Sequence, residues 1–99
     1  MAVKYEVYET NVYTKWFTSL KDERAKARID KRVDRAKHDN FGDWKTESGE
    51  VRAMKIDYGP GYRLYYVIRE DKIIILLCGG IKRNQQADIN KAVDIAKEI

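Results

Sequence analysis

The first third of the chain has the apolar periodicity of one strand followed by two helices. Residues 3–9 alternate between apolar and polar, which predicts a half-buried strand. Thr10 or Asn11 can cap a helix whose apolar residues, from Tyr13 to Leu20, recur at helical spacing. Residues 22–38 carry a narrow apolar stripe on a densely charged helix, which turn-forming residues then end. We expect these two helices to pack as a hairpin.

Three strand-like runs follow a loop at residues 40–50. They cover 51–58, 62–68 and 72–78 and are rich in β-branched and aromatic residues, which favours sheet over helix. The separators between them are short, so we expect an antiparallel meander. The third run is apolar on both faces, as a central strand would be, and the two glycines that follow are expected to end it. Asn84 can cap a last helix that runs to Ile99.

The resulting order, β-α-α-β-β-β-α, predicts an α+β fold in which the helices pack on a twisted, mostly antiparallel sheet. A length of 99 residues suits a single domain covering 1–99. The longest apolar run, at 73–78, is far too short to span a bilayer, and the N-terminus lacks the layout of a signal peptide. We therefore expect a cytoplasmic protein with no membrane partner.

Charge and cysteine content narrow the possible chemistry. The 20 Lys and Arg residues outnumber the 16 Asp and Glu residues, and the net charge of +4 mildly favours a phosphate-bearing or acidic partner. A single cysteine excludes an internal disulfide, and a single histidine leaves no zinc cluster, so no metal or other cofactor is expected. Cys78 has apolar neighbours and is expected to be a core residue.

A tight Gly-Pro-Gly turn stands directly before Arg63 and raises the question of what this arginine does. Arg63 and Tyr65 share the strand face opposite the more apolar set, and Lys55 can share that face across the hairpin. Lys82 and Arg83 follow the next strand, where polar groups often converge on a ligand. Together these residues would form a phosphate-backbone site with a stacking ring. The alternative is a set of solvated cations that bind nothing.

The charged helix at 22–38 has a simpler interpretation. Basic and acidic residues interleave along it, which favours a solvated, salt-bridged face over a helix that binds nucleic acid. We interpret this helix as structural.

Three stretches of the chain form a recognisable pattern: KIDYGPGYRLYYV, IIILLCGGIKRNQQADINKA and FTSLKDERAKARIDKRVDRAKHDNFGD. Over nearly the whole chain this pattern closely resembles the HigB-like killer proteins of bacterial addiction modules, a branch of the RelE/ParE toxin superfamily. The resemblance implies a RelE-like fold and the toxin of a type II toxin-antitoxin system. It also implies a cognate antitoxin, here a small helix-turn-helix protein, that keeps the toxin inactive and connects it indirectly to operator DNA.

RelE-like members cut mRNA on the ribosome, whereas ParE-like members poison DNA gyrase and cut nothing. Carried over by position, the resemblance implies that Arg63 and Arg83 are catalytic arginines and that Lys55 is the basic residue of the preceding strand. The implied reaction is attack of a ribose 2′-hydroxyl on the adjacent phosphate. Lys82 would hold the RNA backbone, and Tyr65 would stack on a base or move a proton.

The chain departs from the pattern of this branch at two places. Ala53 and Lys55 stand where the branch commonly has an acid and an arginine. Ile89 ends the segment in which some RelE members place a tyrosine as a possible base. Two alternatives therefore stay open beside the endoribonuclease: a toxin that binds a protein target such as DNA gyrase, and a degenerate member that only helps its antitoxin bind operator DNA.

Overall fold

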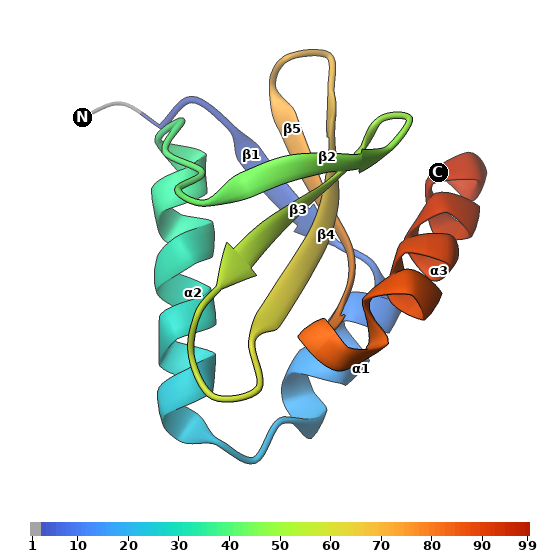
Figure 1. Ribbon diagram of the computed structural model, residues 1–99. Helices are drawn as coiled ribbons and strands as arrows, with labels where there is room; N and C mark the ends of the chain where they lie inside the picture. Colours follow the sequence, from blue (N-terminus) through green and yellow to red (C-terminus); the bar gives the residue numbers. More distant parts are fainter. Residues whose placement is uncertain (1–2) are drawn as a thin grey trace.

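The computed structural model describes residues 3–99 and contains a five-stranded sheet with helices on both faces (Figure 1). Along the chain the elements are β1 (Glu6–Glu9), α1 (Asn11–Ser19), α2 (Glu23–Lys37), β2 (Trp44–Ser48), β3 (Val51–Ile56), β4 (Tyr62–Arg69), β5 (Ile73–Ile81), the 3-10 helix η1 (Lys82–Asn84) and α3 (Gln85–Glu98). The strand order is β1-β5-β4-β3-β2, with β1 parallel to β5 and the other pairs antiparallel. The predicted α+β class is confirmed. No helix within residues 3–99 has the length and apolar character needed to cross a membrane.

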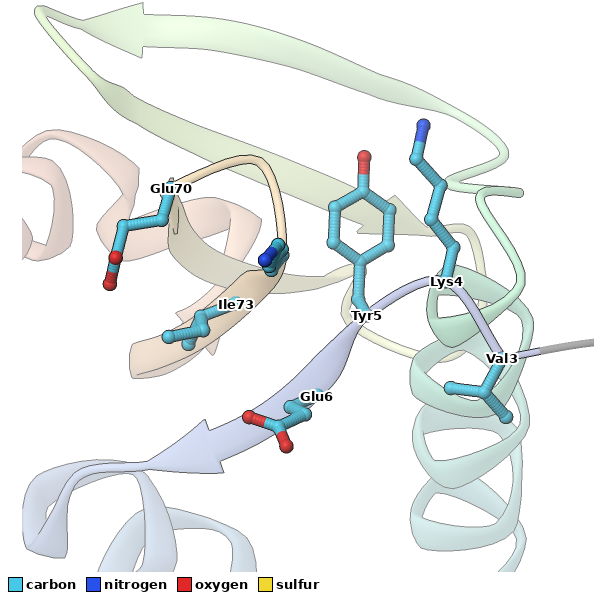
Figure 2. A pocket seen from close by; sticks show the side chains of 7 residues that line it. Val3, Lys4, Tyr5, Glu6, Glu70 and Ile73 are labelled. Carbon is cyan, nitrogen blue, oxygen red and sulfur yellow. The ribbon is translucent and has the colours of Figure 1, made fainter.

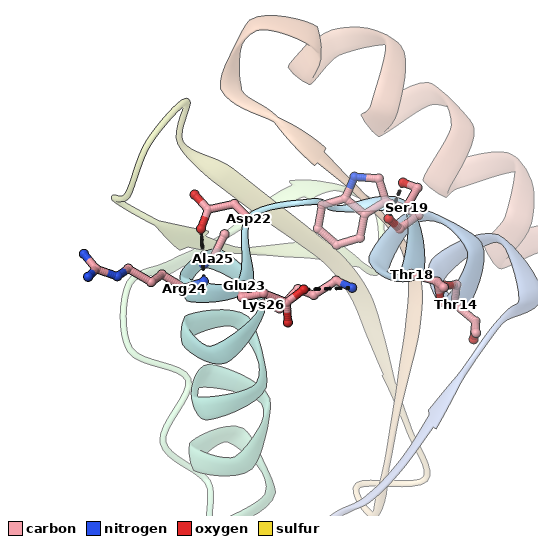
Figure 3. A network of polar contacts seen from close by, with 9 residues as sticks. Thr14, Thr18, Ser19, Asp22, Glu23, Arg24, Ala25 and Lys26 are labelled. Carbon is pink, nitrogen blue, oxygen red and sulfur yellow. Dashed lines mark hydrogen bonds and ion pairs between the residues drawn. The ribbon is translucent and has the colours of Figure 1, made fainter.

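Side-chain caps begin both N-terminal helices. The Thr10 hydroxyl accepts a backbone N–H of α1 at 3.1 Å, which confirms Thr10 as the cap. The Asp22 carboxylate accepts the N–H groups of Arg24 and Ala25 at 3.0 and 3.1 Å (Figure 3). These bonds provide acceptors for backbone N–H groups in the first turn, which have no carbonyl partner within the helix. The expectation that Asn84 caps α3 with its side chain is wrong, because η1 leads directly into that helix.

The sheet separates two cores. On one face, Leu64 and Tyr66 of β4 are fully buried together with Ile29 of α2, in a cluster that α1 also joins. On the other face, Tyr65 of β4 packs in a cluster with Ala92 of α3. Strand β5 lies between β1 and β4 and buries residues on both faces, which confirms its prediction as a central strand.

Residues 44–48, which the sequence places in a loop, form the edge strand β2. Every residue of this strand except Glu47 is exposed, so its side chains carry no apolar alternation. The strand forms because its backbone pairs with β3, from Trp44 opposite Met54 onward. The predicted meander of β3, β4 and β5 is thus confirmed and extended by one strand, whereas β1 is shorter than the predicted strand at 3–9.

The two glycines after Cys78 do not end β5, contrary to the prediction. The strand continues through Gly79 and Gly80 to Ile81. A Cβ atom on Gly79 would overlap the Trp16 ring of α1, and one on Gly80 would overlap the Asp88 carboxylate of α3. The glycines are therefore needed for close packing on both faces of the strand and not for a turn.

A bulge in β5 decides which way these glycines face. Leu77 has no partner on β4, because the residues on either side of it pair with consecutive residues there. One extra residue shifts the alternation of side chains by one position. Consequently Cys78 and Gly80 face α3, and Gly80 lies opposite Arg63.

Replacing Gly79 with alanine is expected to lower the free energy of unfolding by about 1–3 kcal/mol, because the added methyl group meets a packed indole ring. Gly80→Ala is the matched control. Its methyl group meets the end of the Asp88 side chain, which can rotate away, so a smaller loss is expected. Urea unfolding measures both variants, and equal losses would contradict the role assigned to the indole ring.

Candidate functional site

A polar pocket lies where the β3–β4 hairpin meets η1. Its volume is about 280 Å³, and its lining residues are Asp43, Lys55, Asp57, Gly61, Arg63 and Lys82. Three of the five residues that the sequence proposes for a site are therefore brought together here: Lys55, Arg63 and Lys82.

The sheet register and one tight turn position these cations. Lys55 and Arg63 are Cα partners across β3 and β4, so their side chains share a face, as predicted. The N–H of Gly61 donates to the Tyr58 carbonyl oxygen at 3.0 Å, and Gly61 has a φ of 80°, in the left-handed region that favours glycine. The N–H of Lys82 donates to the Gly61 carbonyl oxygen at 2.7 Å. The turn that precedes Arg63 thus also holds the end of β5.

Arg63 is the buried cation of the pocket. It is 8% exposed, and its Nη1 donates to the Tyr62 carbonyl oxygen at 3.2 Å. Its Nε is buried without a hydrogen-bond acceptor, and none of the ion pairs described within residues 3–99 includes Arg63. Burying a guanidinium without an anionic partner is costly. The geometry therefore favours an anionic ligand at this position.

Two carboxylates that the sequence did not single out also line the pocket. Asp43 precedes β2 and Asp57 follows β3, and both are exposed. Neither belongs to any of the ion pairs described within residues 3–99. Asp43 lies just before a strand that the sequence places in a loop, and Asp57 follows β3 because that strand ends at Ile56, two residues before the predicted end. The pocket thus combines three cations with two groups that can accept a proton.

Arg32 of α2 supports one wall of the pocket through the backbone. Its guanidinium donates to the carbonyl oxygens of Phe41, Asp43 and Lys55. A Cβ atom on Gly42 would lie 2.9 Å from Nη2 of Arg32, so glycine leaves the room that this clamp needs. The connection between α2 and β2 is therefore held against β3, with Asp43 and Lys55 side by side.

The other two predicted site residues do not line the pocket. Tyr65 is fully buried where α3 covers the sheet, and its hydroxyl makes no hydrogen bond within the described part of the chain. Burial, with smaller contributions from Asp88 and Glu47, raises the pKa of Tyr65 above its usual value. The expectation that its ring offers a stacking platform is wrong, because α3 covers that part of the sheet. Arg83 is exposed in η1, directly after Lys82, and lies outside the pocket lining.

A second hollow lies at the edge of β1. Figure 2 shows the side chains that line it: Val3, Lys4, Tyr5, Glu6, Glu70, Lys72 and Ile73. Lys4 pairs with Asp39 at 3.2 Å, and the Tyr5 hydroxyl donates to the same carboxylate at 3.4 Å. Lys4 and Tyr5 thus share a carboxylate partner, whereas none of the ion pairs described within residues 3–99 gives one to Arg63. Within residues 3–99 no group of three or more His, Cys, Asp or Glu side chains is arranged to hold a metal ion.

Cys78 is predicted to be unreactive in the folded protein. Burial, with a smaller contribution from Asp88, raises the pKa of its thiol to about 12, so little thiolate is present at neutral pH. We expect a thiol-specific chromogenic disulfide to react at less than about one hundredth of the rate seen in denaturant. Rapid labelling of Cys78 without denaturant would contradict this prediction and would show that β5 opens easily.

Inorganic phosphate is expected to stabilise the wild-type protein more than an Arg63→Met variant, in which the buried side chain keeps its length but loses its charge. Ligand at ten times its dissociation constant raises the free energy of unfolding by about 1.4 kcal/mol. Thermal unfolding with phosphate, and with sodium chloride at matched ionic strength as the control, measures this effect. Equal stabilisation of both proteins would exclude Arg63 as the anion-binding group.

A known protein is related to this chain over almost its full length. No protein-family model matches the sequence. The chain is 38% identical, over 94 residues, to an uncharacterized protein of Haemophilus influenzae, and the match covers 95% of each protein. The chain therefore belongs to the same protein family as this Haemophilus influenzae protein.

Proposed function

We propose that this protein is the toxin of a type II toxin-antitoxin system and that it cleaves mRNA on the ribosome. The observation that carries the proposal is the buried guanidinium of Arg63, which shares a pocket with Lys55 and Lys82 and has no carboxylate partner among residues 3–99. Cations in this arrangement suit the negative charge that develops on a phosphate during its displacement. The resemblance in the β3–β4 hairpin and in β5 supports a RelE-like topology for the sheet and helices.

The proposed reaction is a transesterification within the RNA strand. A ribose 2′-oxygen attacks the adjacent phosphorus, the O2′–P bond forms, and the bond from phosphorus to the 5′-oxygen of the next nucleotide breaks. The products are a cyclic phosphate and a free 5′-hydroxyl. Arg63 stabilises the charge on the non-bridging oxygens, for which a guanidinium has matching geometry, while Lys55 and Lys82 hold the backbone.

The pocket also offers groups that can move the two protons. Asp43 and Asp57 are the carboxylates that can accept the proton of the 2′-hydroxyl, and the Lys82 ammonium can donate one to the departing 5′-oxygen. Arg83 adds positive charge next to Lys82 outside the pocket. Because both carboxylates are exposed, alignment of the RNA depends on the ribosome, and the free protein is a poor nuclease.

The proposed partners follow from the resemblance. A small helix-turn-helix antitoxin binds the toxin in the cytoplasm, blocks its activity and brings it to operator DNA. The reaction as written needs no metal or organic cofactor, since the phosphate charge is met by side-chain cations.

Arg63→Ala is expected to reduce ribosome-dependent cleavage of a defined mRNA by about 10²–10³-fold, because it removes the main group that stabilises the phosphate charge. Primer extension in a reconstituted translation reaction, with and without ribosomes, locates and quantifies the cuts. Wild-type cuts are expected only with ribosomes. Lys97→Ala, at an exposed position of α3, is the matched control and should cut like the wild type.

The same experiment separates the alternatives. Full cleavage by a folded Arg63→Ala protein would remove Arg63 from the site. Intact mRNA in the presence of folded wild-type protein would overturn the nuclease proposal, and a gyrase supercoiling assay would then test the ParE-like alternative. Inhibition of gyrase would support that alternative. Its absence would favour a protein that acts only with its antitoxin at operator DNA.

A further inference from the structure

The charges of α2 interleave along the sequence but separate around the helix. At about 100° per residue, four basic residues share about 60° of arc and form what we term the basic stripe: Arg24, Arg28, Lys31 and Arg35. The three acidic residues of α2 share a different arc of about 40°: Glu23, Asp30 and Asp34. The interpretation of this helix as a face of paired opposite charges is therefore wrong on the side of the stripe.

None of the ion pairs described within residues 3–99 includes a residue of the basic stripe. All four residues are exposed, and the one ion pair described for α2 joins Lys26 to Glu23 at 3.9 Å. Figure 3 shows Arg24 extending away from the protein, on the side of α2 opposite Lys26. The Arg28 guanidinium lies 4.5 Å from the centre of the Tyr58 ring. Like charges three or four residues apart repel one another, so the stripe weakens the helix unless anions neutralise it.

Two shallow hollows lie along the basic stripe, and the second adjoins the pocket that contains Arg63. The first runs along the helix and is lined by Arg24, Ala27, Arg28 and Lys31. The second lies between α2 and the β3–β4 hairpin and is lined by Arg28, Lys31, Arg32, Arg35, Ile56 and Asp57. Asp57 lines the pocket as well. An extended polyanion that follows the stripe therefore reaches the pocket past a single carboxylate, that of Asp57.

We propose that the basic stripe binds the phosphate backbone of the RNA strand next to the bond that is cut. Its cations recur about once per helical turn, or about every 5.4 Å, which suits a regular row of phosphates better than the irregular carboxylates of an acidic protein. The neighbouring Tyr58 ring is occupied by Arg28, so the stripe contacts backbone and not bases. The inference rests on the proposed function for its substrate, but its test needs no cleavage.

The test compares two variants with the same loss of charge. The stripe variant carries Arg24→Gln, Arg28→Gln, Lys31→Gln and Arg35→Gln. The control variant carries Gln at four exposed lysines of other segments: Lys15, Lys72, Lys91 and Lys97. Fluorescence anisotropy with a short labelled single-stranded RNA gives the affinity at several salt concentrations. A plot of log affinity against log salt concentration has a negative slope. In the stripe variant this slope should become less steep by about 2–3, and in the control variant by less than about 1.

Folding of each variant is checked by circular dichroism and urea unfolding. If the stripe variant does not fold, the double variant Arg24→Gln and Lys31→Gln carries the test, with about half the change in slope. Replacing the three arginines with lysine keeps the charge and should keep the slope. Equal losses in the stripe and control variants would overturn the proposal, since net charge alone would explain them. Unchanged RNA affinity with weaker binding to ribosomes or to an antitoxin would also overturn it.

Arg63→Ala separates this inference from the proposed function. This variant should lose cleavage but keep RNA affinity within about threefold, because the stripe supplies most of the phosphate contacts. If the wild type binds RNA through the stripe but cuts no mRNA with ribosomes, the proposed function fails and the inference stands. If cleavage depends on Arg63 while the stripe variant binds RNA like the control, the inference fails alone.

Discussion

The hydrogen bond between the Lys82 N–H and the Gly61 carbonyl oxygen joins the β3–β4 turn to the end of β5, and the pocket depends on it. The turn sets the register that places Lys55 opposite Arg63. The start of η1, directly after β5, adds the third cation, Lys82. Because the bond is between backbone atoms, it holds the two segments together whatever the surrounding charges do. This hydrogen bond therefore keeps Lys55, Arg63 and Lys82 close together although their positive charges repel one another.

Stability and binding are supplied by different parts of this protein. The two apolar clusters on either side of the sheet hold the fold, with fully buried residues such as Ile29 and Leu77. Apart from Arg32, which donates to three backbone carbonyl oxygens, the charges of the pocket and of α2 contribute little to that stability, because most of them belong to no ion pair described within residues 3–99. Proteins commonly accept such local costs where a ligand supplies the missing charge. The two apolar cores thus stabilise a fold in which the cations of the pocket and of α2 are close together, and a bound anion would neutralise them.

Apolar alternation and short turns were enough to predict the helices, the β3–β5 meander and the common face of Lys55 and Arg63. Two features depend on how neighbouring strands pair and could not be found in this way. Strand β2 has no apolar alternation and forms through its pairing with β3, and the bulge at Leu77 shifts the faces of β5. Alternation also does not show that Tyr65 is covered, because α3 packs over the middle of a sheet face whose end is polar. The charges of α2 were misjudged because sequence order does not show how side chains group around a helix.

Strand β1 pairs with β5 in parallel, so the N-terminal strand is completed by residues that lie more than half the chain away. Contacts between such distant segments form slowly, since a long loop must close first. During synthesis, β3 and β4 can form a hairpin early, but neither the centre of the sheet nor the position of Lys82 is complete until β5 has left the ribosome exit tunnel. While β5 is still inside the exit tunnel, the growing chain therefore has no complete pocket and cannot yet act on the ribosome that makes it.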